Sequence, residues 1–122
     1  MKIEVSFAEI LDKVSILAIK LNYIKDEEKL TNIAKEFQSL TSVLSPSVFI
    51  DPLYNDLCSV NQELWHIEDD IREKGRIGEF DGEFIRLARN VYITNDKRAD
   101  IKRAINVKYG SEFIEEKSYN PY

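Results

Sequence analysis

The residues with the most evident capacity for chemistry lie together in Glu63–Lys74 (ELWHIEDDIREK), which holds five acids, two bases, the only histidine and the only tryptophan. Glu63 and His66 have the Glu-x-x-His spacing that di-iron bundle proteins use for half of their ligand set. The other half needs a second histidine, which the chain lacks. Asp69 and Asp70 are adjacent, so on a helix they point about 100° apart and are poorly placed to share Mg²⁺. We therefore expect no metal site and no cofactor.

A second set of candidates begins with a cation on an apolar face. Arg98 lies in the middle of the apolar stripe of residues 84–109. A buried cation is costly unless it is paired and hydrogen-bonded, so we expect Arg98 to be largely buried and to meet an acid. Glu68, which flanks the apolar stripe of the preceding helix, is the best-placed acid, and Glu9 and Asp12 are the alternatives.

Two interpretations of this polar set stay open. In the first, Glu68 and Arg98 form a structural pair that fixes the register of the helices. In the second, the helices enclose a pocket for a small carboxylate or phosphate, because arginine binds such groups through two parallel hydrogen bonds. Trp65 is then either a wall of the pocket or ordinary core packing. The candidate pocket residues are Asn61, Glu68, Arg72, Asn95, Arg98 and Lys102.

Helices must position these side chains, and the first half of the chain predicts two. Ser6 and Glu9 form a capping box ahead of an apolar repeat at helical spacing. Asp26, with acids at the next two positions, suits the start of a second helix. The sequence leaves one alternative open, a single long helix that runs through Asp26. We predict the turn.

The second half of the chain predicts two longer helices. Asp51 followed by Pro52 is typical of a helix start, and this helix should run to about Lys74. Its buried stripe should be Leu57, Val60, Leu64, Ile67 and Ile71. Asp81 caps a fourth helix that should end near Gly110. With an extended N-terminus and an irregular C-terminal tail, this is an all-α antiparallel bundle of about four helices.

Composition limits the classes of function. A length of 122 residues and 43% hydrophobic residues predict one domain over residues 1–122, with its own core. The net charge of −5 argues against nucleic acid as a partner. The single cysteine favours a cytoplasmic setting, and we expect no membrane span and no signal peptide. Ile16, Ile19 and Tyr23 form a second apolar side on the first helix, which predicts a homodimer contact there.

Four phrases together carry a resemblance to a known family: EILDKVSILAIKLNYIKDEEKLTNIAKEF, NQELWHIEDDIR, FIRLARNVYITNDKRADIKRAIN and GSEFIEEKSYNPY. They resemble a family of uncharacterised small helical proteins of bacteria and phages. Its members are sometimes encoded beside, or fused to, glycosyltransferases for surface polysaccharide, so the resemblance implies a glycosyltransferase as a partner. The matching positions are Asp12, Lys13, Lys20, Glu68, Asp69, Arg72, Arg89, Asn95, Asp96, Arg98, Lys102, Asn106 and Lys117.

A looser similarity is to the all-helical chorismate mutases, which hold a dianion between helices with arginine and lysine, often in a dimer. The spacing of Arg and Lys that marks the first long helix of those enzymes is not present here. This similarity is one of fold alone.

Three functions follow. The first is a non-catalytic accessory or binding module that acts as a homo-oligomer and is linked to surface-glycan metabolism. The second is a small enzyme that binds an anionic metabolite in the Arg/Lys pocket. The third is a metal-dependent nucleotide pyrophosphohydrolase, in which Glu68 and an acid such as Asp96 would hold the metal. A dry contact between Glu68 and Arg98 would favour the first function, and an open cavity at Arg98 would favour the second.

Overall fold

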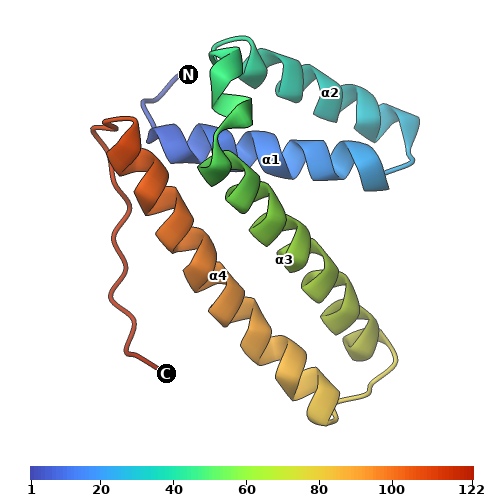
Figure 1. Ribbon diagram of the computed structural model, residues 1–122. Coiled ribbons are helices and arrows are strands. Elements are labelled where there is room, and N and C mark those ends of the chain that lie inside the picture. The colour runs from blue at the N-terminus through green and yellow to red at the C-terminus, as the bar shows by residue number, and fades with distance from the viewer.

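The computed structural model describes residues 1–122 and contains only helices (Figure 1). They are α1 (Phe7–Tyr23), α2 (Glu27–Thr41), the short 3-10 helix η1 (Pro46–Ile50), α3 (Pro52–Arg76) and α4 (Gly82–Lys108). The prediction of an all-α protein with four main helices, an extended N-terminus and an irregular tail is confirmed.

Each α-helix begins at a side chain that accepts a hydrogen bond from its first turn. Ser6, Asp26, Asp51 and Asp81 accept from the backbone N–H groups of Glu9, Lys29, Leu53 and Phe84, respectively. These acceptors satisfy donors that have no partner within the helix. Because α1 ends at Tyr23 and Asp26 caps α2, the predicted turn is confirmed and the alternative of one long helix is wrong.

The helices form two hairpins that cross. The α3–α4 hairpin is the longer one, and α1 lies across both of its helices near the start of α3 and the end of α4 (Figure 1). The α2 helix contacts α1 alone and buries no residue fully. Sequential helices are therefore neighbours within each hairpin but not between α2 and α3, because η1 separates them.

The core lies where α1 meets the other helices. Leu11 and Leu57 are 1% and 0% exposed, and Ile105 is 0% exposed, so each of the three helices contributes at least one fully buried aliphatic side chain. On α3 the predicted stripe is buried from Leu57 to Ile67 and half-buried at Ile71.

The second apolar side of α1 meets α3 within the same chain. Ile19 is buried, and the Tyr23 ring stacks on Trp65 with ring centroids 5.7 Å apart. Trp65 therefore covers part of the face on which we expected a second copy. The homodimer itself stays a prediction.

One buried carboxylate ties the start of α3 to the end of α4. Asp51 is 7% exposed; it caps α3 at Leu53, pairs with Lys108 at 2.6 Å and accepts from the Tyr109 hydroxyl. Its hydrogen bond from Lys108 has the largest effect, and with those from Tyr109 and Leu53 it lowers the pKa of Asp51 from 3.8 to about 2.

We predict that Asp51 controls part of the acid sensitivity of the fold. Its folded pKa lies below its unfolded pKa, so its stabilisation is complete above about pH 4 and is lost as the pH falls from about 4 to about 2. Asp51→Asn keeps a good helix cap but loses the charge, so it should be less stable at pH 7 and lose stability less steeply below pH 4. Urea midpoints between pH 2 and pH 7 measure this.

Asp56→Asn, an exposed site on α3, is the control. A wild-type pH profile for Asp51→Asn would contradict the prediction.

Candidate functional site

A buried polar cluster joins three helices at the middle of the bundle. Asn61, which is 4% exposed, donates to the Asp12 carboxylate at 2.8 Å and to the Ser15 hydroxyl at 2.7 Å. The Ser15 hydroxyl in turn donates to the backbone carbonyl of Asp12 at 2.8 Å. The Asn61 carbonyl oxygen accepts from Arg98. The carboxamide of α3 thus connects α1 on one side with the guanidinium of α4 on the other.

The guanidinium of Arg98 has few partners. Its one hydrogen bond to protein, to Asn61, spans 3.4 Å, which is long for a bond of this kind. Arg98 is half-buried and forms no ion pair. Since a guanidinium carries five N–H donors, most of its donor capacity is free for a ligand.

The expected pairing of Arg98 with Glu68 is wrong. Glu68 forms its ion pair with Arg72 on its own helix, at 3.4 Å. Arg98 is also half-buried rather than largely buried. Arg98 and Glu68 lie at different heights along the bundle. Arg98 is level with Asn61, and Asn61 lies about two helical turns before Glu68 on α3.

The buried cation of α4 is Lys102, whose side chain is only 10% exposed. Its ammonium group lies 2.6 Å from Glu9, 3.5 Å from Glu115 and 3.9 Å from Asp12. The two acids of α1 that were alternatives for Arg98 therefore neutralise Lys102 instead. A buried lysine with three nearby acids meets the requirement that buried charges be paired.

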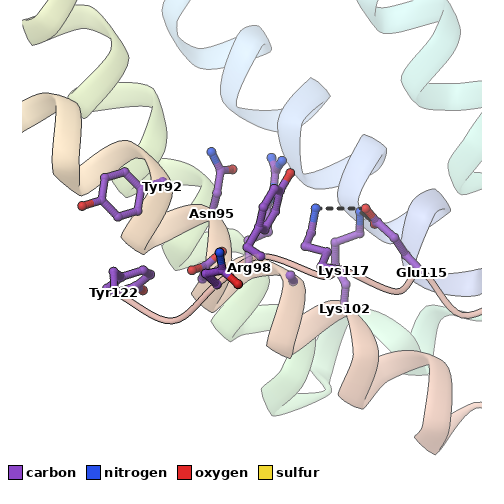
Figure 2. Close-up of a pocket in the computed structure, with 11 residues that line it drawn as sticks. Tyr92, Asn95, Arg98, Lys102, Glu115, Lys117 and Tyr122 are labelled. Carbon is purple, nitrogen blue, oxygen red and sulfur yellow. Dashed lines mark ion pairs between the residues drawn. The ribbon is translucent and has the colours of Figure 1, made fainter.

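A cavity of about 530 Å³ separates α4 from the C-terminal tail (Figure 2). This volume lies within the range typical of small-molecule sites. Three cationic side chains and two acidic ones line the cavity, although the whole chain has a net charge of −5. Its lining residues are Tyr92, Asn95, Asp96, Arg98, Ala99, Lys102, Glu115, Lys117, Tyr119, Asn120 and Tyr122.

A second hollow, of about 410 Å³, lies between α1 and α3. Ile16, Ile19, Leu64 and Trp65 supply its apolar wall, and Asn61, Glu68, Asp69, Arg72 and Arg98 supply its polar wall. The structure thus divides the six candidates. Asn95 and Lys102 line the tail cavity, while Asn61, Glu68 and Arg72 line the second hollow. Arg98 lines both.

The sequence reasoning missed the contribution of the tail. Glu115, Lys117, Tyr119 and Tyr122 all line the cavity, and so does Tyr92 of α4. The tail has no helical periodicity, so a helical-wheel projection cannot give the direction of its side chains. Two signals were available: the last six positions, KSYNPY, hold three aromatic or cationic residues, and Lys117 is among the positions that match the family.

Three titratable groups of the cavity have pKa values shifted by their neighbours. A hydrogen bond from Lys117, with help from the charge of Lys102, lowers the pKa of Glu115. The same bond raises the pKa of Lys117, although the charge of Arg98 opposes this. Burial, followed by the nearby Asp96, raises the pKa of the Tyr122 phenol. These shifts all lead away from neutrality.

No group of three or more His, Cys, Asp or Glu side chains lies close enough together to hold a metal ion. Glu68 and Asp96 line different cavities. His66 is exposed beside Tyr23 and Gln62, at the end of α1. No helix has the length and apolar character needed to cross a membrane.

Comparison with protein families gives one match. The model of a family of unknown function, DUF6165, matches residues 1–122. The chain belongs to this family. Comparison of this DUF6165 protein with curated proteins and with solved structures gives no match. The association with glycosyltransferases and the similarity to chorismate mutases both stay predictions.

We predict that Asn61 contributes more to stability than Arg98 does. Asn61→Ala removes donors from the buried Asp12 and should cost about 2–3 kcal/mol in the free energy of unfolding. Arg98→Ala removes one long bond to a neutral amide and should cost about 1 kcal/mol or less. Urea denaturation at pH 7 measures both. Equal losses for the two variants would contradict this ranking.

Proposed function

We propose that this DUF6165 protein is a non-catalytic binding module that holds a small anion in the cavity between α4 and the C-terminal tail. The observation that carries the proposal is Arg98, a half-buried guanidinium that lines this cavity without an acid partner. Leaving a cation partly desolvated and unpaired is unfavourable. A carboxylate or phosphate on Arg98 would supply the missing partner, and arginine is well suited to bind either group through two hydrogen bonds.

The other two cations of the cavity support an anion less directly. Lys102 and Lys117 already share the Glu115 carboxylate, which lies 3.5 Å from the first ammonium and 3.1 Å from the second. This carboxylate illustrates the chemistry that the cavity favours, because here two lysines converge on one anionic group. The anionic group of a ligand would therefore bind Arg98, which has no acid partner, in preference to the two lysines.

The pKa shifts of three lining residues favour binding over acid–base catalysis by those residues. General acid–base catalysis works best when the pKa of the catalytic group is near the working pH. The pKa shifts of Glu115, Lys117 and Tyr122 all lead away from that range. We therefore place a small enzyme acting on the same anion second. For a metal-dependent pyrophosphohydrolase, we find no supporting observation.

The wider setting of the protein is part of the proposal. The family resemblance supports a role beside a partner enzyme of surface-glycan metabolism, such as a glycosyltransferase, and the single cysteine supports the cytoplasm. Exposed apolar side chains at the far end of the α3–α4 hairpin support self-association. Ile77, Phe80 and Ile85 are 47%, 67% and 59% exposed.

We predict a homodimer in solution. Because Trp65 covers part of the second apolar side of α1, the exposed hairpin end is now the better contact, and Phe80→Ser should weaken association. Sedimentation equilibrium at micromolar concentration measures the mass. Val43→Ser, an exposed apolar site near the end of α2, is the control. A monomer for the wild type would contradict the homodimer and leave anion binding unaffected.

We predict that inorganic phosphate stabilises the protein through Arg98. At ten times its dissociation constant a ligand adds about 1.4 kcal/mol to the free energy of unfolding, which corresponds to a rise of several degrees in Tm. Thermal unfolding in phosphate and in chloride at equal ionic strength measures this. Arg98→Gln should lose the rise.

Phosphate also stabilises proteins by exclusion from their surface, so the comparison between variants is decisive. Arg86→Gln is the matched control, because Arg86 lies on the same helix and pairs with Glu83 outside the cavity. Equal phosphate responses in the wild type and Arg98→Gln would overturn the proposed function.

A further inference from the structure

The tail cavity has two chemically different ends. Figure 2 shows Lys102, Lys117 and Glu115 toward one end, Tyr92 and Tyr122 at the other, and Arg98 with Asn95 between them. This difference between the two ends follows from the direction in which the C-terminal tail runs. The tail runs back along α4, so its ionic residues come beside the last turns of that helix and its final tyrosine comes beside Tyr92 (Figure 1).

The aromatic end is an open corner. The rings of Tyr92 and Tyr122 meet edge to face, with centroids 5.1 Å apart and planes at 76°. Both remain accessible, at 40% and 69% exposed. Asn95 of α4 and Asn120 of the tail line the adjoining part of the cavity and offer amide donors and acceptors. Aromatic faces beside amides suit a ring that carries polar groups on its edge.

The distance between the two kinds of surface fits a small molecule. Arg98 lies six positions after Tyr92 on α4, which is about 9 Å along the helix axis. A phosphate group on Arg98 would leave room for one attached ring to reach the tyrosine corner. Phosphate suits this place better than carboxylate, because it has three terminal oxygens and close to two negative charges. Arg98 and Lys117 lie near enough for the charge of one to affect the other.

We propose that the ligand is a phosphate monoester of a ring compound. Its phosphate binds Arg98 with help from Lys117, and its ring lies against Tyr92 and Tyr122. The inference rests on the proposed function and deepens it by naming the class of ligand. A nucleoside or a sugar can supply the ring, and both share the chemistry that the cavity recognises.

Isothermal titration calorimetry with three probes tests the inference: inorganic phosphate, adenosine 5′-monophosphate and glucose 1-phosphate. At least one ester should bind about tenfold or more tightly than inorganic phosphate, as expected for a ring stacked on an aromatic side chain. The tighter ester identifies the ring as a base or a sugar. If inorganic phosphate binds and neither ester binds more tightly, the inference is overturned and the proposed function stands.

Variants at the two ends separate their roles. Replacing both tyrosines, Tyr92→Leu with Tyr122→Leu, should bring the affinity for the ester down to that of inorganic phosphate and leave inorganic phosphate unaffected. Tyr23→Leu, at an exposed tyrosine outside the cavity, should change neither. An ester advantage that survives in the double variant overturns the inference. Absence of binding for all three probes overturns the proposed function as well.

Discussion

The burial of one carboxamide is the constraint on which the rest of the structure depends. Asn61 lies in the core at 4% exposure, and its amide must find partners there or leave polar atoms unsatisfied. It finds them on both neighbouring helices, in Asp12 and Ser15 of α1 and in Arg98 of α4. No buried side-chain polar atom of the protein lacks a partner. A shift of α1 or α4 by one turn along α3 would break this set, so the cluster fixes the relative heights of three helices.

This constraint also distinguishes Arg98 from Lys102, the two cations of α4 that line the tail cavity. Lys102 lies one turn beyond Arg98, where the acids of α1 and the tail neutralise it. Arg98 meets the neutral amide of Asn61 and faces hollows on two sides. Arg98 is thus a half-buried guanidinium with free donors and no acid partner. That contrast is why we assign ligand binding to Arg98 and a structural role to Lys102.

Local signals in the sequence predicted the elements well, because capping and periodicity are properties of neighbouring residues. Ser6, Asp26, Asp51 and Asp81 each begin a helix as expected. A helical wheel gives the direction of a side chain but not its height against another helix, so the expected pairing of Arg98 with Glu68 was wrong. The same limit applies to the second apolar side of α1, because a wheel did not show that Tyr23 stacks on Trp65 of the same chain. The irregular tail carries neither signal.

The most direct measurement of the central claim is the response of arginine side chains to phosphate in solution. Nitrogen-15 spectra of the Nε–Hε groups resolve individual arginines, and Arg98→Lys identifies the signal of Arg98. On titration with inorganic phosphate, the signal of Arg98 should move and saturate, while that of Arg86, paired with Glu83 outside the cavity, should stay in place. An Arg98 signal that does not move, or that moves linearly together with all the others, would contradict the account.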